Sequence, residues 1–345
     1  MIDPGVPTVL LHIGTHKTGT TSIQATVAHN AAIFARAGIL VPRSGLALTK
    51  GGNLQYGHHN LAWELNDIDA LFDPRDGTMV QTLEEIAAAK ARVAILSSED
   101  FEWLHAKPAV LQRLASDFAS IGYRVAVVLY LRRQPEYVQA IYVEGSKSGF
   151  LMNYNSVFRE VVATGTFVPD PRVVNRFEYG PLAGAYAGAF GAENLIVRAY
   201  EGNRPQQALL REFVDLASNG AVQFEALAIP GALNASPDFV AVLSGMYRAV
   251  AARQPAAPSP QALIARRYPQ GDPAFLQKFD VMLEPETRTL LERFAAGNRR
   301  IASEYGAHVP FETEGDLRPP GDPRWSSVVK QRAVLEDALE SWGVG

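Results

Sequence analysis

Residues 10–24 read LLHIGTHKTGTTSIQ, and this stretch decides how the chain is expected to fold. Its apolar run is of strand type and ends at Gly14, while helix-compatible residues resume at Thr20 and continue through Val27. The pattern predicts a strand, a tight loop and a helix. Such a loop directs backbone N–H groups and the positive end of the helix dipole at one small volume, where an anion fits. The side chains expected around that volume are Lys17, Thr18, Thr20, Thr21 and Ser22.

The position of the lysine decides which ligand is expected. A Walker A loop reads GxxxxGK[ST], and Gly14 and Gly19 reproduce its two glycines, but Lys17 lies inside the loop instead of after it. The sequence GTHKTGTTS resembles the 5′-phosphosulfate loop of sulfotransferases that use 3′-phosphoadenosine 5′-phosphosulfate (PAPS). The resemblance implies that Lys17 stabilises charge on the bridging oxygen of PAPS. The cofactor-binding residues that it implies in the loop are Gly14, Thr15, His16, Lys17, Thr18, Gly19, Thr20, Thr21 and Ser22.

Composition and charge describe an ordinary globular protein of 345 residues, 47% of them hydrophobic. A net charge of −4 gives no overall positive field, so we expect no nucleic-acid partner. The absence of cysteine excludes disulfides and thiolate chemistry and fits a reducing compartment. The apolar run near the N-terminus is short and no basic segment precedes it, so we expect neither a signal peptide nor a membrane span, and a cytoplasmic location.

The chain after the loop continues as a βαβ unit. One amphipathic helix is predicted over residues 20–37 and a short strand over residues 39–41. Residues 43–57 contain several glycines and are expected to form a surface loop, and such loops often carry binding residues. His58 and His59 end this loop and precede a helix. Either could be a catalytic base, or both could be hydrogen-bonded surface or cap residues.

Polar residues 97–100, Ser-Ser-Glu-Asp, follow a short strand predicted over residues 93–96. Side chains at the carboxyl end of a parallel strand face the crevice in which ligands bind, so Glu99 is expected near the anion loop. The alternative is that these residues only cap the next helix. Resemblance to sulfotransferases implies that Glu99 removes the acceptor's proton, a role for which a dry crevice would have to raise its pKa.

Arginines follow the clearest buried strand, residues 124–131, which is expected to be central in the sheet. Two guanidiniums at a strand end favour an anion, although they could also pair with acidic neighbours. The strand-Arg-helix pattern resembles the 3′-phosphate site of sulfotransferases, with Arg132 in the place of the motif arginine. The serine that the family usually carries eight residues later falls on Ala140, which departs from the pattern.

The expected fold is a three-layer α/β domain with a central parallel sheet of about five strands, flanked by helices and related to the P-loop nucleotide-binding proteins. Resemblance to PAPS-dependent sulfotransferases covers residues 9–201. We expect a PAPS-binding core over residues 1–233 and a helical extension over residues 234–345 packed on it, with one continuous domain as the alternative.

The resemblance implies transfer of a sulfuryl group from PAPS, without a metal, to a hydroxyl or amine of a small-molecule or glycan acceptor. A saccharide or other aliphatic alcohol is expected as that acceptor. Two alternatives remain at this point. A nucleotide-dependent kinase would use the same loop, with Glu99 or Asp100 helping to hold Mg²⁺. A non-catalytic adenosine-nucleotide or polyanion binding protein would need no base in the crevice.

Overall fold

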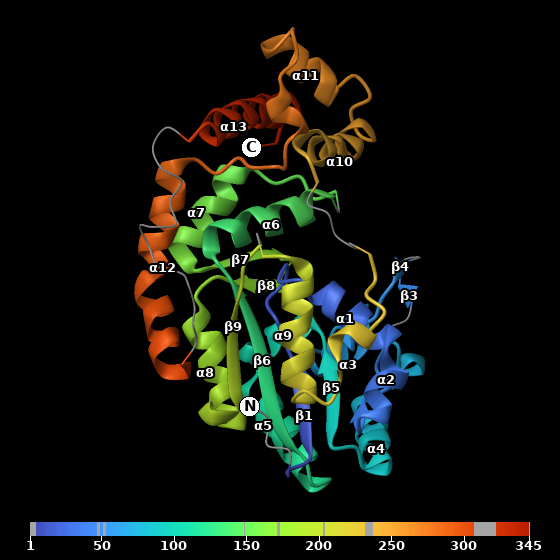
Figure 1. Cartoon of the computed structure of the whole chain (residues 1–345). Helices are drawn as coiled ribbons and strands as arrows, with labels where there is room; N and C mark the ends of the chain where they lie inside the picture. Colours follow the sequence, from blue (N-terminus) through green and yellow to red (C-terminus); the bar gives the residue numbers. More distant parts are fainter. Residues whose placement is uncertain are drawn as a thin grey trace. The chain divides into compact units, whose positions relative to one another are not determined.

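The computed structural model of the chain describes residues 5–46, 49–50, 53–147, 149–170, 173–202, 204–231, 237–306 and 322–344. Contacts divide the chain into two compact units (Figure 1). Unit 1 comprises Met1–Arg132, Glu178–Leu233 and Gly297–Pro310, and unit 2 comprises Arg133–Phe177, Asn234–Ala296 and Phe311–Gly345. The expected division into residues 1–233 and 234–345 stays a prediction, and its boundary lies outside the described residues.

Unit 1 is built on a five-stranded parallel sheet, as the sequence predicts. Its strands are, in spatial order, β2 (Ile39–Leu40), β5 (Val93–Ser97), β1 (Thr8–His12), β6 (Arg124–Arg132) and β9 (Leu195–Tyr200). All five residues of β1 and all five of β5 are buried, which explains why these strands read as continuous apolar runs. The middle strand is β1; the expectation that residues 124–131 are central is wrong by one position, because β6 lies beside β1.

Helices cover both faces of this sheet. The helices of unit 1 are α1 (Thr20–His29), α2 (Ala31–Arg36), α3 (His59–Leu65), α4 (Met79–Ala89), α5 (Pro108–Ser120), α8 (Tyr179–Phe190) and α9 (Gln206–Ser218). Its short 3-10 helices are η1 (Pro74–Asp76), η2 (Glu99–Ala106), η3 (Ala192–Asn194) and η4 (Phe224–Ala226), and β3 (Thr49–Lys50) pairs with β4 (Asn53–Leu54). Helices α1, α2 and α9 pack on one face, where α9 crosses the front of the sheet in Figure 1, and α5 and α8 pack against β6 on the other.

This topology brings together the carboxyl ends of β1 and β5, the edge at which a ligand-binding crevice is expected. The two strands are neighbours, with His12 opposite Ser97 in the register. The chain leaves β1 toward α1 on one face and leaves β5 toward α5 on the other. Ligands of open parallel sheets bind where neighbouring connections diverge in this way. The loop after β1 and the residues after β5 therefore meet at the same edge.

The single helix predicted over residues 20–37 is wrong, because the chain breaks at Asn30 between α1 and α2. The side chain of Asn30 donates to the carbonyl oxygens of Thr26 (2.8 Å) and Ala228 (2.9 Å) and accepts from the backbone N–H of Ala228 (2.9 Å). An asparagine that binds backbone groups competes with the helix for them. The partner at residue 228 is distant in sequence, so the periodicity of residues 20–37 carries no sign of the break.

Unit 2 is mainly helical. Its elements are α6 (Gln134–Lys147), α7 (Tyr154–Thr164), β7 (Thr166–Asp170), β8 (Val173–Arg176), α10 (Phe239–Ala251), α11 (Pro260–Arg267), η5 (Pro273–Leu276) and α13 (Arg324–Ser341). Helix α12 (Glu284–Tyr305) belongs to unit 2 as far as Ala296. Stacked aromatic rings form the core, with Phe279 between Tyr142 (5.9 Å) and Phe239 (5.7 Å). The antiparallel pair β7–β8 was not expected from the sequence.

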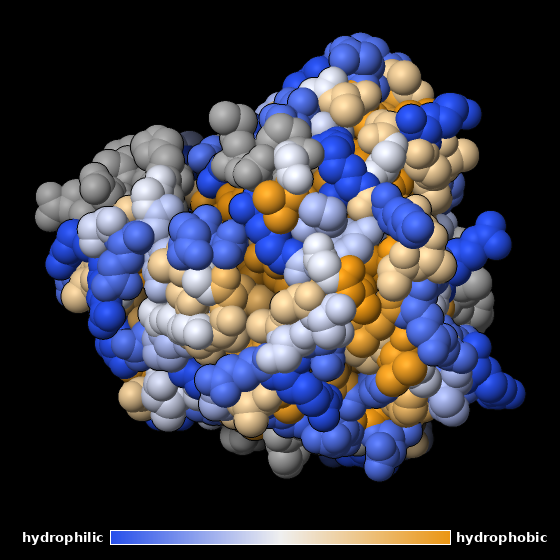
Figure 2. Space-filling view, turned by 90° about the horizontal axis from the view of Figure 1, so that it is seen from below, coloured by the Kyte–Doolittle hydropathy of each residue, from blue (hydrophilic) through white to orange (hydrophobic). Residues whose placement is uncertain are grey.

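Figure 2 shows the molecule from below the view of Figure 1, with hydrophilic residues around the edges and hydrophobic residues in patches between them. Large apolar side chains with a high exposed fraction include Val80 (63%) in unit 1 and Leu276 (76%) in unit 2. Single exposed apolar side chains are normal on folded proteins and mark no site.

Candidate active site

The loop between β1 and α1, residues 13–19, is held to the sheet through its first half. The backbone N–H of Ile13 donates to the carbonyl of Val128 (3.0 Å), and that of Thr15 donates to the carbonyl of Tyr130 (2.9 Å). The hydroxyl of Thr18 is buried and donates to the carbonyl of Thr15 (2.5 Å). This hydroxyl therefore closes the loop internally instead of donating outward.

The second half of the loop presents its amides to the crevice. No residue of the described ranges accepts a hydrogen bond from the backbone N–H groups of Thr18, Gly19, Thr20 and Thr21. These are the last residues of the loop and the first turn of α1, where N–H groups have no partner within the helix. Consecutive N–H groups at the positive end of a helix dipole form an anion site. The arrangement fits the tetrahedral oxygens of a phosphate or sulfate.

Steric constraints explain why glycine occupies positions 14 and 19 of the loop. Gly19 has a φ of 80°, and a Cβ there would lie 2.5 Å from a methyl carbon of Leu209 on α9. A Cβ at Gly14 would lie 2.8 Å from the methyl carbon of Thr20. Lys17 itself has a φ of 64°, the left-handed region, which turns the chain sharply in the middle of the loop. The loop thus holds a tight turn packed against a helix, with its amides open.

His16 is held between two carboxylates of η2. Its Nε2 lies 3.0 Å from Oδ1 of Asp100, its Nδ1 lies 3.1 Å from Oε2 of Glu102, and its backbone N–H donates to the same Oε2 (3.2 Å). The ring stacks on Trp103, with centroids 5.3 Å apart. Burial alone would lower the pKa of His16, but the hydrogen bonds and charges of Asp100 and Glu102 outweigh it and raise the pKa to about 10. The loop therefore carries an imidazolium at neutral pH.

Asp100 joins this histidine to His59. Its Oδ2 lies 3.4 Å from Nδ1 of His59 and accepts a hydrogen bond from the indole N–H of Trp63 (2.8 Å). Burial would raise the pKa of Asp100, but the hydrogen bonds and charges of the two histidines lower it. The pKa of His59 is raised, because the charge of Glu99 and the contact with Asp100 outweigh burial. Asp100 thus remains a carboxylate between the rings of His16 and His59.

Glu99 lies at the start of η2, partly buried, and accepts a hydrogen bond from the amide of Gln24 on α1 (2.8 Å). Burial would raise its pKa, but the charges of His59 and His16 overcome both burial and the opposing charge of Asp100, so its pKa is lowered. The direction is opposite to the one expected from a dry crevice. Glu99 is an ionised carboxylate, and its position joins α1 to the end of β5.

His58 lies in a different environment from His59, although the two are adjacent in sequence. Its Nδ1 accepts from the backbone N–H of Ser97 (3.2 Å), and its Nε2 donates to the carbonyl of Pro42 (3.0 Å). Burial lowers the pKa of His58 to about 4. Both ring nitrogens of this neutral imidazole are bound to backbone, so we assign it a structural position. Of the two candidate histidines, His59 is the one beside Glu99 and Asp100.

Arg132 lies at the end of β6 and reaches the anion loop. Its Nη1 donates to the carbonyl of Lys17 (2.8 Å), and its guanidinium lies 5.4 Å from the ring centroid of Tyr200 on β9. Its own carbonyl accepts from the hydroxyl of Tyr179 (2.5 Å). Arg133, the next residue, forms an ion pair with Glu136 (3.1 Å), which is the pairing with an acidic neighbour that the sequence left open as an alternative. Arg132 is thus the arginine that borders the site.

Ala140 on α6 remains a departure from the family pattern. Ser146 of the same helix donates to the carbonyl of Tyr142 (2.8 Å) and is fully buried, so its hydroxyl serves the helix. Ser148 lies outside the described residues.

Sequence reasoning missed two residues of the site. Glu102 contacts His16 across a sequence separation of 86 residues, and Gln24 contacts Glu99 across 75. One signal was available for Glu102: a carboxylate three residues after Glu99 lies on the same side of a 3-10 helix. Nothing in the sequence distinguishes Gln24 from an ordinary polar helix residue.

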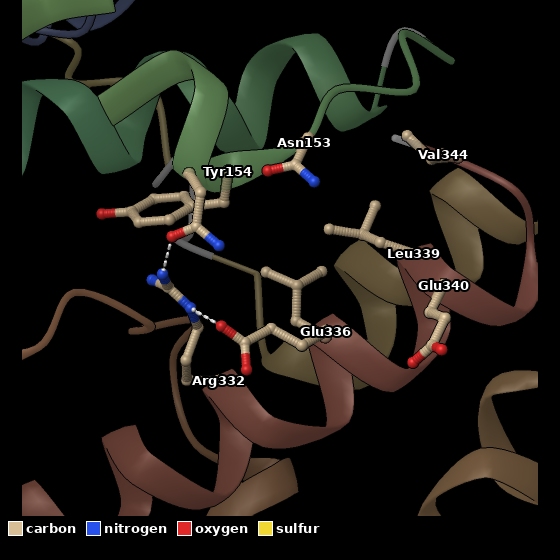
Figure 3. Close-up of a pocket in the computed structure, with 9 residues that line it drawn as sticks. Asn153, Tyr154, Arg332, Glu336, Leu339, Glu340 and Val344 are labelled. Carbon is tan, nitrogen blue, oxygen red and sulfur yellow. Dashed lines mark hydrogen bonds and ion pairs between the residues drawn. The ribbon is translucent and has the colours of Figure 1, made fainter. Parts of the chain in front are cut away.

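A separate pocket of about 330 Å³ lies within unit 2, between the start of α7 and α13 (Figure 3). Its polar wall is Arg332, which forms ion pairs with Glu286 (3.0 Å) and Glu336 (2.8 Å) and donates to Asn155. Leu335 and Leu339 form its apolar wall. Because its arginine is bound by the protein's own carboxylates, the pocket presents no group prepared for an anion.

Two observations bear on metal and membrane. Within the described ranges, no three or more His, Cys, Asp or Glu side chains form a group that could hold a metal ion. None of the helices in the same ranges has both the length and the apolar character that crossing a membrane requires.

No family model and no curated protein matches the chain. Among solved structures, the chain is similar to a sulfotransferase from Alicyclobacillus acidocaldarius. The two share 12% sequence identity, the match covers 87% of this chain and 96% of that chain, and the TM-score is 0.46.

Proposed function

We propose that the chain is a sulfotransferase that moves the sulfuryl group of PAPS to a hydroxyl group of a small-molecule or glycan acceptor. The observation that carries the proposal is the anion loop, whose four backbone N–H groups from Thr18 to Thr21 donate to no acceptor among the described residues. Lys17 lies within the same loop, and Arg132 binds its carbonyl from the end of β6. In this proposal the loop binds the phosphosulfate and Arg132 binds the 3′-phosphate.

The residues divide the reaction between them. The acceptor oxygen forms a bond to sulfur while the bond from sulfur to the bridging oxygen breaks, and the electron pair of that bond remains on the adenosine 3′,5′-bisphosphate product. Lys17 and the loop amides stabilise the charge that develops on the bridging oxygen. Glu99 takes the acceptor's proton and later releases it to water. His59 beside it holds the carboxylate ionised before the reaction.

A saccharide or other aliphatic alcohol is the acceptor that we propose. Such a hydroxyl needs a positioned base, because its own pKa lies far above that of a phenol. Beside Glu99, the stacked rings of His59 and Trp63 (5.8 Å) place aromatic surface of the kind on which sugar rings pack next to the proposed base. An amine acceptor is an outcome of the same assay.

The experiment is a turnover assay with ³⁵S-labelled PAPS against a panel of sugars, aliphatic alcohols, phenols and amines, in excess EDTA. Label transferred to an acceptor, with full activity in EDTA, supports the proposal, since Lys17 and the amides supply the charge that Mg²⁺ gives a kinase. Turnover of ATP that requires Mg²⁺ would identify a kinase instead. Tight nucleotide binding without transfer to any acceptor class would identify a binding protein.

Arg132 provides an internal test of the nucleotide. Arg132→Ala is expected to weaken binding of adenosine 3′,5′-bisphosphate about tenfold or more, and to weaken adenosine 5′-phosphate less, because only the first carries a 3′-phosphate. Isothermal titration calorimetry measures both. Equal losses for the two nucleotides would mean that the arginine acts only through the carbonyl of Lys17.

A further inference from the structure

His16 carries both of its ring protons by geometry. Each ring nitrogen faces a carboxylate oxygen, Asp100 Oδ1 at 3.0 Å and Glu102 Oε2 at 3.1 Å. An ionised carboxylate only accepts hydrogen bonds, so both nitrogens must donate, and an imidazole with two N–H donors is the imidazolium. The charged ring is part of the loop, directly before Lys17.

The carboxylates around the loop explain why a positive charge on His16 would be needed there. Three carboxylates, Glu99, Asp100 and Glu102, lie beside a loop that is proposed to bind an anion, and Glu102 has no exposed surface. Unpaired, they would repel a phosphosulfate, and a buried unpaired carboxylate is itself costly. The imidazolium of His16 faces Asp100 and Glu102, and the ring of His59 contacts Asp100 as well. Together with Lys17 and Arg132, His16 balances the charge of the three carboxylates before an anion binds.

The same contacts fix the loop. Glu102 accepts from the backbone N–H of His16 as well as from its ring, and Trp103 stacks on the other side of the ring. This anchor lies between the one at Thr15, on the carbonyl of Tyr130, and the one at Lys17, on Arg132. Residues 15–17 are therefore held at three successive points, and residues 18–21 are the ones left open.

We propose that His16 is a charge-bearing part of the anion site and that Asp100 and Glu102 are its positioning residues. This rests on the proposed function for the identity of the ligand, while the state of the histidine is independent of it. The ionisable groups that face His16 are Asp100 and Glu102 from η2. Glu99 and His59 interact with His16 electrostatically, and Lys17 follows it in the chain.

The test compares Glu102→Gln, His16→Gln and the double variant, with Asp67→Asn as the matched control. Asp67 is a carboxylate of the same unit that pairs with Lys107 (2.7 Å), with 85% of its side chain exposed. Calorimetry measures the affinity for adenosine 3′,5′-bisphosphate, and thermal unfolding measures stability. Glu102→Gln is expected to lose about tenfold or more in affinity and to lower Tm, whereas the control changes neither.

The double variant separates charge from structure. With both charges removed, Tm should recover much of the loss seen for Glu102→Gln, while affinity stays at least about tenfold below wild type. Affinity that recovers together with Tm would overturn the proposal and leave His16 as a structural anchor.

Nitrogen NMR of the imidazole rings reads His16 without any ligand. A doubly protonated His16 at pH 8 that becomes neutral in Glu102→Gln supports the proposal, and a neutral ring in the wild-type protein refutes it. If the wild-type protein does not bind adenosine 3′,5′-bisphosphate at all, the proposed function fails. In that case the affinity of the same variants for inorganic pyrophosphate decides the role of His16.

Discussion

Lys17 is the residue on which the proposed chemistry depends most. Its charge matters most while the bridging oxygen becomes anionic, so Lys17→Ala is expected to lower kcat by a factor of about 100 or more. Binding of adenosine 3′,5′-bisphosphate should change far less. Steady-state kinetics with labelled PAPS and calorimetry with the product measure the two effects.

Retention of wild-type turnover by Lys17→Ala would remove the loop from the catalytic machinery. A parallel loss of turnover and product affinity would instead mean that Lys17 binds the nucleotide uniformly. Lys107→Ala, at a half-buried lysine of the same unit that pairs with Asp67, is the control.

Glu99 makes a prediction about pH because its pKa is lowered from an ordinary 4.5. A base that is already ionised loses activity only when it is protonated. We therefore expect kcat to stay level from pH 8 down to about 5, and to decrease only at pH values below the ordinary pKa of a glutamate. Glu99→Gln keeps the shape and the contact with Gln24 but removes the base. It should bind PAPS normally and lose turnover on an alcohol while keeping much of any turnover on an activated phenol.

The profile of kcat against pH, measured with an alcohol and with an activated phenol as acceptor, checks this. An acidic limb near pH 6 to 7 would point to His59 as the base. Wild-type turnover of an alcohol by Glu99→Gln would leave Glu99 as a structural residue of the first turn of η2, which Ser98 caps.

The sequence could predict site residues that belong to a local motif. It could not predict site residues that the fold brings to the motif from distant parts of the chain. Lys17 and Arg132 stand at motif positions, and the structure brings them into contact through the Lys17 carbonyl. Glu102 and Gln24 owe their place to the pairing of β1 with β5, because the segments that follow these two strands meet at one edge of the sheet. Charge states were least predictable: the pKa of Glu99 depends on two histidines whose positions no local pattern reveals.

Elements were predictable where periodicity was local. The strand expected over residues 93–96 matches β5 (Val93–Ser97), because its apolar residues are continuous and all buried. The break at Asn30 was not predictable, because the groups that stabilise it belong to residue 228. The β7–β8 pair was missed because its strands are short and contain Pro169.

Gly19 makes the element-scale prediction, because it joins the anion loop to α9. Gly19→Ala places a methyl group 2.5 Å from Leu209, in addition to the strain of a φ of 80°. The matched control is Gly122→Ala, whose φ is 81° but where a Cβ meets nothing within 4 Å. Both should lose about 1 kcal/mol from strain, and Gly19→Ala should lose about 1–3 kcal/mol more from overpacking.

Chemical denaturation measures the two free energies of unfolding, and calorimetry measures nucleotide affinity. Gly122→Ala should bind adenosine 3′,5′-bisphosphate like wild type, and Gly19→Ala should bind it more weakly because the open amides shift. Equal stability losses in the two variants would mean that the loop gives way freely and does not pack rigidly on α9.

At the scale of the whole molecule, the order of the sheet explains why the site forms where it does. With β5 and β6 on either side of β1, the loop after β1 receives Glu99, Asp100 and Glu102 from one neighbour and Arg132 from the other. The class of fold was predictable from alternating strands and helices. The strand order was not, because apolar parallel strands carry no local record of their neighbours.

Buried histidines predict how stability depends on pH. The pKa values of His12 and His58 are lowered by burial from 6.5 to about 4, so each stays neutral in the fold. Between those values the unfolded chain binds more protons than the folded one. Their contribution is therefore fully present above pH 6.5 and is lost as pH falls toward 4. That difference in pKa corresponds to about 3 kcal/mol for each histidine.

His16 acts in the opposite sense, because its carboxylate partners outweigh burial and raise its pKa from 6.5 to about 10. Its contribution is fully present below pH 6.5 and is lost as pH rises toward 10. The free energy of unfolding is expected to be greatest near pH 6.5 and to fall on both sides. Denaturant unfolding at pH 4.5, 6.5 and 9 measures the curve, with His58→Gln expected to flatten its acid limb and His16→Gln its alkaline limb. Because the two variants act on opposite limbs, a variant that flattens the limb assigned to the other would contradict the charge states on which the site is built.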